Sequence, residues 1–323
     1  MSVGANIRKR RFELKMTQQE LATAMGYSNR ATIAKIESGE NDVTHSKLQR
    51  FAVVLDTTVD ALVSGSESVA LPQDTPIIQS EWDENTPRNK NVVVILAGGK
   101  SCRNSQNIPN QFITVLGKPV IVYCMESYQN HPTIDDIYVV CLKGWESIVK
   151  AYAEKYHITK LRGIIPAGAY GIRSLKNGFE FVKSKYNDED VIIFQESTRP
   201  MVSVEIISKL IQACNALGSA NICLPMRDHL LFSVSSGSEK IADRETTVEV
   251  QSPEAYKFCE LEKIFAKAEN KQHPLTESCG AMLLYNLGQY VNFVEGSVSN
   301  VKIIRQEDVA IFTSLLHQTN LRM

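Results

Sequence analysis

The chain has 323 residues and a net charge of −1, with charged residues making up 22% of the composition. This near-neutral balance gives no global argument for nucleic acid or for an anionic surface as the partner. The length suits two domains better than a single core, and no apolar stretch reaches the about 18 residues that a membrane span needs.

The seven cysteines include no C-x-x-C pair, and no cysteine or histidine spacing typical of a metal site occurs. The first residues also lack the apolar core and cleavage site of a secretory signal. We therefore expect a cytoplasmic protein with reduced thiols and no membrane association.

Residues 1–64 carry apolar positions at helical spacing, which predicts a group of short helices. Thr17 is suited to cap one of these helices, and Glu20, three residues later, would complete a capping box. A second helix is expected from near Ser28 to about Glu37, after a tight turn. Two short helices joined in this way indicate an all-α helix-turn-helix domain.

This stretch resembles the Cro/repressor-type helix-turn-helix family, also called the XRE family, over roughly residues 5–63. In such modules the second helix enters the major groove of double-stranded DNA. Arginine can pair with guanine and asparagine with adenine, whereas residues at the start of the first helix reach phosphates. The resemblance implies a DNA-binding surface made of Gln18, Gln19, Asn29, Arg30, Thr32 and Lys35, with a basic start at Arg8, Lys9, Arg10 and Arg11.

Acidic and basic residues nearly balance within residues 1–64, so one copy is expected to bind DNA weakly. Useful affinity would need a homodimer on two half-sites. The alternative is that these polar faces are solvated and that the module serves protein–protein contact.

Residues 65–90 are rich in serine, proline, asparagine and acidic residues and show no sustained periodicity, which predicts a linker. From residue 91 to 323, short apolar stretches alternate with helical ones, as in an α/β domain with a mainly parallel sheet. The expected strands are residues 92–97, 134–141, 191–195, 220–225 and 300–305, and the expected helices are residues 119–129, 172–186, 203–217 and 306–318.

The stretch "LAGGKSCRN", residues 96–104, follows the first of these strands and suggests a phosphate site. A P-loop would require a glycine at Val94, inside the strand, so that motif is excluded. The dinucleotide-binding fingerprint is excluded as well, because no third glycine opens a helix.

The strand, the glycine loop with its arginine, and the following "NIPNQF" resemble the sugar- and polyol-phosphate nucleotidyltransferases, whose loop reads roughly L-A-[AG]-G-x-G-x-R-M and then P-K-Q-[FY]. Within that group the motif most resembles the cytidylyltransferases that make CDP-methylerythritol or CDP-ribitol. The residues "NIPNQF" favour the ribitol-5-phosphate branch. The later blocks "RSLKNGFEFV", "FQESTRP", "DRETTVEVQSPEAYKF" and "NVKIIRQEDVAI" match the family in order. The resemblance implies a Rossmann-like nucleotidyltransferase domain with a twisted sheet and a dimerisation arm.

The resemblance also implies the reaction, which is transfer of CMP from CTP to a polyol phosphate of the ribitol-5-phosphate or methylerythritol-4-phosphate type. Positioned cations and backbone donors would stabilise the developing charge. By family position, Arg103 would hold the triphosphate, Lys302 the α-phosphate and Arg244 the polyol phosphate across a dimer. The loop Ala97, Gly98 and Gly99 and the side chain of Ser174 would bind the nucleotide, and Glu196 would bind Mg²⁺.

Several positions depart from the family pattern. Asn110 replaces the lysine of P-K-Q, Ser101 replaces a glycine, Glu196 replaces the metal-binding aspartate, and Gly171 replaces an arginine. Lys100 is a candidate to replace the missing cation at residue 110. These changes leave three alternatives open: an enzyme with a DNA-binding head, a transcription regulator whose degenerate domain only senses a nucleotide or polyol phosphate, and a dimerising scaffold.

Overall fold

The computed structural model describes residues 3–14, 16–25, 27, 29–41, 43, 45–55, 57, 62, 88–102, 108–226, 232–234, 238–243 and 246–320. The chain divides into two compact units, residues 1–78 and 79–323. The division at residues 64 and 90 that the sequence suggests stays a prediction. Each of the seven cysteines is a free thiol. No helix in the described part of the chain combines the length and apolar character that a membrane crossing requires.

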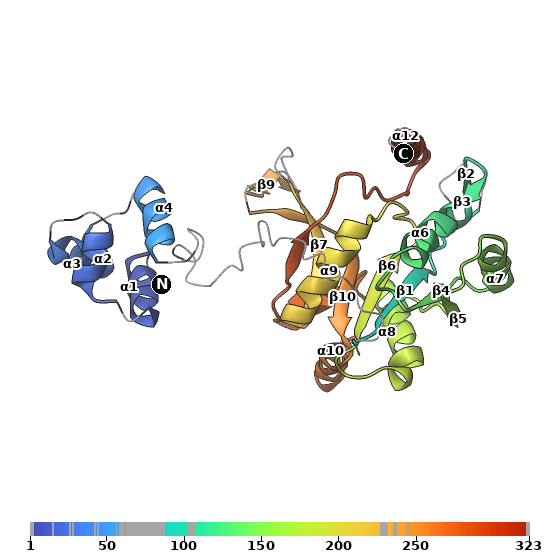
Figure 1. Ribbon diagram of the computed structural model, residues 1–323, viewed down its shortest axis with the longest axis horizontal. Coiled ribbons are helices and arrows are strands. Elements are labelled where there is room, and N and C mark those ends of the chain that lie inside the picture. Colours follow the sequence, from blue (N-terminus) through green and yellow to red (C-terminus); the bar gives the residue numbers. More distant parts are fainter. Residues whose placement is uncertain are drawn as a thin grey trace. The chain divides into compact units, whose positions relative to one another are not determined.

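The smaller unit is helical, as predicted (Figure 1). Its helices pack around a core that includes Ile7, Leu21, Ile33 and Phe51. The described helices are α1 (Val3–Glu13), α2 (Gln18–Ala24), α3 (Arg30–Ser38) and α4 (His45–Val54).

The capping box at the start of α2 is confirmed. The Thr17 hydroxyl accepts from the Glu20 amide at 3.2 Å, and the Glu20 carboxylate accepts from the Thr17 amide at 2.6 Å. Helix α3 begins later than predicted, because the Asn29 side chain caps it by accepting from the Ala31 amide at 2.9 Å.

The larger unit contains a seven-stranded sheet in the order β11-β7-β10-β6-β1-β4-β5. Neighbouring strands are parallel except at β10, which runs antiparallel to β6 and β7. The prediction of a mainly parallel sheet is therefore confirmed. The strands are β1 (Asn91–Ala97), β4 (Asp136–Cys141), β5 (Leu161–Pro166), β6 (Val191–Glu196), β7 (Ser219–Pro225), β10 (Val248–Lys257) and β11 (Phe293–Glu295).

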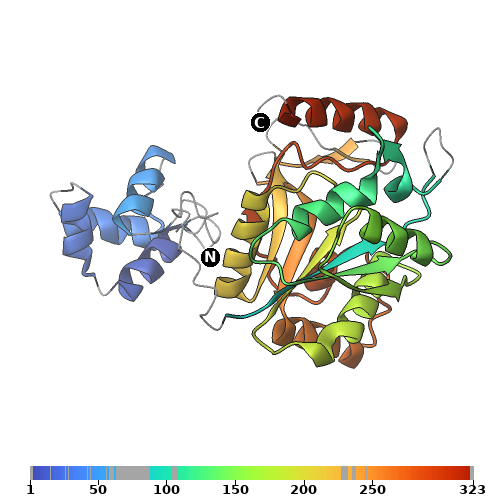
Figure 2. The same ribbon diagram turned by 45° about the vertical axis from the view of Figure 1, so that its right-hand side comes forward.

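Helices cover both faces of this sheet (Figures 1 and 2). Alternate residues of β1 belong to two cores, with Val93 and Ile95 in one and Val92 and Val94 in the other. On the first face lie α6 (Val120–Gln129), α7 (Glu146–Lys155) and α9 (Val204–Leu217). On the second lie α8 (Gly171–Val182), α10 (Phe258–Asn270) and α11 (Gly280–Asn286).

Short elements complete the unit. They are the 3-10 helices η1 (Asn110–Phe112) and η2 (Lys183–Lys185), the strand pair β2 (Thr114–Val115) and β3 (Lys118–Pro119), the strand pair β8 (Phe232–Val234) and β9 (Ser238–Ile241), and the helix α12 (Gln306–Asn320). The dimerisation arm implied by the resemblance stays a prediction.

The prediction of a strand over residues 300–305 is wrong. This segment has no regular secondary structure and joins no sheet. Its contacts are made singly: the Ile303 amide donates to the Thr198 carbonyl at 2.8 Å, and the Asn110 side chain donates to the carbonyls of Ile303 and Ile304. One backbone bond to Thr198 and the side-chain donor of Asn110 therefore take the place of a strand partner.

Candidate nucleotide-binding site

A cavity of about 760 Å³ lies where β1, β5 and β6 end. The chain builds β1, β4 and β5 in one direction and then returns to place β6 on the other side of β1. In open parallel sheets, this reversal at the carboxyl ends of the strands is where ligands bind. The lining comes from the loops after those three strands, from η1, from β10, from the start of α11 and from residues 302–304.

The glycine loop after β1 forms one wall of the cavity. A Cβ at Gly98 would lie 2.5 Å from the Ala167 Cβ, so only glycine fits without a shift. The buried Gln111 side chain anchors the loop by donating to the carbonyl of Ala97 at 2.9 Å and of Gly99 at 2.8 Å. Gly98 and Gly99 line the cavity as the sequence suggests. Ala97 is buried in the sheet core and does not line the cavity, and its role as a binding residue stays a prediction.

Asn110 also lines the cavity, but its amide is directed to the backbone on the opposite side. It donates to the carbonyls of Ile303 at 3.3 Å and Ile304 at 2.9 Å, and its backbone amide donates to the Ser101 carbonyl at 2.9 Å. The side chain is almost fully buried. The family's phosphate-facing lysine is thus replaced by a residue that ties the glycine loop to the segment carrying Lys302.

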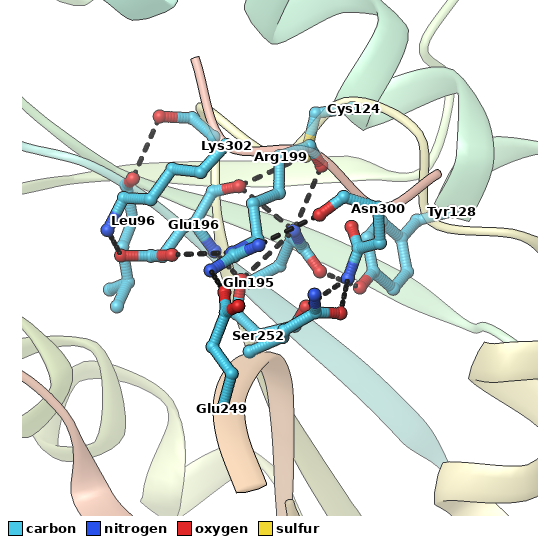
Figure 3. Close-up of polar contacts among 12 residues, drawn as sticks. Leu96, Cys124, Tyr128, Gln195, Glu196, Arg199, Glu249, Ser252, Asn300 and Lys302 are labelled. Carbon is cyan, nitrogen blue, oxygen red and sulfur yellow. Dashed lines mark hydrogen bonds and ion pairs between the residues drawn. The ribbon is translucent and has the colours of Figure 1, made fainter. Parts of the chain in front are cut away.

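Glu196, at the end of β6, lies between two cations (Figure 3). One carboxylate oxygen pairs with the Lys302 ammonium, and the other accepts from the Arg199 Nε at 3.1 Å. Burial opposes ionisation of Glu196, but the two cations outweigh it and hold the pKa of the carboxyl below its ordinary value. The ion pair holds the Lys302 ammonium at the cavity wall.

A buried hydrogen-bond network holds Glu196, Arg199 and the segment before Lys302 in place (Figure 3). The Gln195 amide donates to the carbonyls of Glu196 at 2.9 Å and Arg199 at 3.1 Å, and its oxygen accepts from the Tyr128 hydroxyl at 2.8 Å. The Arg199 guanidinium also donates to the Asn300 carbonyl at 2.8 Å. The turn after β6 and the segment leading to Lys302 are therefore held together.

The predicted magnesium site at Glu196 stays a prediction. Both carboxylate oxygens already serve cations, and a divalent ion would have to displace Lys302 or Arg199. Nowhere among the residues that the structure describes do three or more acidic, histidine or cysteine side chains gather around a possible metal position.

The loop after β5 closes another side of the cavity. The Ser174 hydroxyl accepts from the Gly168 amide at 3.0 Å, so Ser174 shapes this turn as well as lining the cavity. A Cβ at Gly171 would lie 2.1 Å from the Ser278 carbonyl oxygen, which excludes an arginine there. Arg173, two positions on, donates to the carbonyls at residues 274 and 275. It therefore does not replace the family arginine.

Arg103 and Arg244 lie outside the described residues, so their roles stay predictions. Sequence reasoning assigned no role to Gln111, Arg199 or Asn300. Each lies inside a stretch that resembles the cytidylyltransferase family, and this location is the sequence signal that could have identified it. Their function as anchors depends on contacts across the fold that no local pattern shows.

In the helical unit, Asn29, Arg30, Lys35 and Gln19 are exposed, and Thr32 is half-buried. Their availability is consistent with the predicted DNA surface. Gln18 is expected to reach the DNA backbone, but in the structure its side-chain amide donates to the Glu37 carboxylate at 2.9 Å.

Arg11 does not belong to the basic start that the sequence suggests. Its guanidinium is buried and forms a bidentate pair with Glu37, at 2.6 Å and 2.9 Å. This pairing joins α1 to α3 and withdraws Arg11 from contact with phosphates.

The glycine loop, the lysine at the cavity wall and the switch-point cavity are features of a nucleotidyltransferase. A family described as 2-C-methyl-D-erythritol 4-phosphate cytidylyltransferase matches residues 91–318, and a helix-turn-helix family matches residues 7–62. The chain belongs to this cytidylyltransferase family and carries a helix-turn-helix region before it. Both resemblances seen in the sequence are confirmed.

Among curated relatives, a ribitol-5-phosphate cytidylyltransferase of Lacticaseibacillus paracasei is 30% identical over 230 residues, which cover 71% of this chain and 98% of that protein. A 2-C-methyl-D-erythritol 4-phosphate cytidylyltransferase of Clostridium botulinum is 29% identical over 231 residues, covering 71% and 99%. A solved structure, 4-diphosphocytidyl-2C-methyl-D-erythritol synthase from Anaerococcus prevotii, has a TM-score of 0.59 at 20% identity and covers 71% of this chain and 99% of its own. That last similarity shows the shared fold.

Proposed function

We propose that the larger unit is a cytidylyltransferase that transfers CMP from CTP to a polyol phosphate, with ribitol 5-phosphate favoured over methylerythritol 4-phosphate. The observation that carries the proposal is the cavity that both the Gly98–Gly99 loop and Lys302 line. Ribitol 5-phosphate is favoured because the Lacticaseibacillus relative is named for it and because the "NIPNQF" motif resembles that branch.

In the proposed reaction, an oxygen of the polyol phosphate attacks the α-phosphorus of CTP. A new phosphorus–oxygen bond forms, the bond to the β-phosphate oxygen breaks, and pyrophosphate leaves. The chain supplies positioning and charge stabilisation and forms no covalent bond to the substrate. Lys302 exchanges its contact with Glu196 for the α-phosphate, Arg103 holds the triphosphate, and Arg244 holds the acceptor phosphate from the other protomer of a homodimer.

The test is pyrophosphate release by the full-length chain with CTP and each acceptor. Lys302→Ala should lower the rate by about 10²–10³, the cost of losing one transition-state donor. Lys118→Ala is the matched control, because Lys118 pairs with Glu126 at 2.7 Å and does not line the cavity. No turnover with either acceptor at high enzyme concentration would contradict the proposal.

We further propose that the helix-turn-helix region binds double-stranded DNA as a homodimer. The exposed Arg30 and Lys35 on the predicted recognition helix α3 support this reading. Selection of duplexes from a random pool by the full-length chain would test it, and failure to enrich any sequence would contradict it.

A second candidate is a regulator that senses nucleotide without turning it over. It is favoured by the loss of two family cations, at Asn110 and Gly171. In that case CTP or CDP-ribitol should change the affinity for the selected duplex while no pyrophosphate is released. Equal affinity with and without these ligands would exclude it.

A further inference from the structure

Most charged side chains that line the cavity already have an ion-pair or hydrogen-bond partner within the protein. The described lining contains three cations and two carboxylates, namely Lys100, Arg199, Lys302, Glu196 and Glu254. Glu196 pairs with both Lys302 and Arg199. Glu254 accepts hydrogen bonds from the Gly280 and Ala281 amides and from the Tyr256 hydroxyl.

Lys100 differs from the other two cations. It is exposed and directly follows Gly98 and Gly99. Within the described parts of the chain, no carboxylate lies within ion-pair distance of it. A triphosphate that enters the cavity can therefore use this ammonium without breaking an existing pair, whereas the use of Lys302 or Arg199 requires an exchange.

Asn110 cannot supply the charge that the family places at its position. The residue is neutral, and its amide donates to the carbonyls of Ile303 and Ile304. The same residue holds the loop beside Lys100, because its backbone amide donates to the Ser101 carbonyl at 2.9 Å. Asn110 therefore anchors the loop instead of binding phosphate. The Ser101 carbonyl that it contacts directly follows Lys100, the cation without an ion-pair partner among the described residues.

We propose that Lys100 binds the β- or γ-phosphate of CTP and takes over the role of the lysine that is missing at residue 110. This inference rests on the proposed function. Charge-assisted hydrogen bonds to phosphate are stronger than neutral ones, so one such contact has a measurable effect on affinity.

The test is calorimetric titration of CTP, CDP and CMP, without acceptor, into the full-length wild type, Lys100→Ala, Lys100→Arg and the control Lys118→Ala. Lys100→Ala should weaken CTP and CDP by about ten- to a hundredfold, the effect expected of one hydrogen bond to a charged group. It should leave CMP unchanged, and Lys100→Arg should retain most of the affinity.

Two results would overturn the inference alone: CTP affinity of Lys100→Ala equal to that of wild type and Lys118→Ala, or an equal loss for CMP and CTP. Failure of the wild type to bind CTP would overturn the proposed function and this inference with it. Circular dichroism of each variant checks that the exposed substitution leaves the fold intact.

Discussion

The replacement Gln111→Glu tests the anchoring of the glycine loop. It keeps the size of the side chain but removes the amide that donates to the carbonyls of Ala97 and Gly99 at 2.9 Å and 2.8 Å. Each buried acceptor left without a donor costs about 1–3 kcal/mol, so the pair costs about 2–6 kcal/mol. Because whole domains have a free energy of unfolding of about 5–15 kcal/mol, the loss should be large.

The assay is urea unfolding followed by tryptophan fluorescence, to which Trp82 and Trp145 contribute. The Trp145 ring stacks on Phe112, next to Gln111, with 4.1 Å between ring centroids. The midpoint should fall, and CTP affinity should fall with it, because the loop loses both anchors. Gln111→Met removes the same donors without adding a carboxylate, so it should show the loss that is due to the missing hydrogen bonds alone. An unchanged midpoint for Gln111→Glu would refute the reasoning.

Three further predictions concern other positions. Burial opposes ionisation of Glu196, yet the cations beside it lower its pKa, so its stabilising effect is present above pH 4.5 and is lost as pH falls through the folded-state pKa. The difference in Tm between wild type and Glu196→Gln should therefore shrink below pH 4.5, and a constant difference would contradict this. Gly171→Ala should lower the unfolding free energy by about 1–3 kcal/mol, because its Cβ would lie 2.1 Å from the Ser278 carbonyl oxygen. A thermal scan that shows no loss would show that the turn can relax. Arg30→Ala should weaken binding to a selected duplex by about 1–3 kcal/mol and relax its base preference, as measured by fluorescence anisotropy. Unchanged affinity and preference would remove Arg30 from the contact surface.

Sequence alone predicts those features that depend on neighbours along the chain. The capping box of Thr17 and Glu20 is local, so the start of α2 could be predicted to the residue. The apolar run ending at Ala97, followed by two glycines, likewise indicates a buried strand and a phosphate loop. The start of α3 is less certain from sequence, because several polar residues could cap it and the fold uses Asn29.

Two differences from the predicted elements depend on contacts distant in sequence. Strand β10 contains Pro253 and a register shift between Gln251 and Glu254, which interrupts the alternation that identifies a strand. Residues 300–305 include the apolar β-branched residues typical of a strand. Hydrogen bonds with Asn110 and Thr198 hold them in place instead of a strand partner. Such pairings across the fold leave no local pattern.

The same limit applies to the site. The sequence shows that Gly171 replaces an arginine, but only the approach of Ser278 explains why no side chain fits. It shows that Asn110 replaces a lysine, but not that the amide anchors the segment carrying Lys302. Substitutions that suggest decay are, in the structure, parts of a closely bonded cavity wall.

A crystal structure of the full-length chain with CTP would test the central claim most directly. We expect the phosphates to lie against the backbone amides of Gly98 and Gly99, with the Lys302 ammonium turned from Glu196 to the α-phosphate. A nucleotide bound elsewhere, or a Lys302 that keeps its contact with Glu196 while CTP occupies the cavity, would contradict the account.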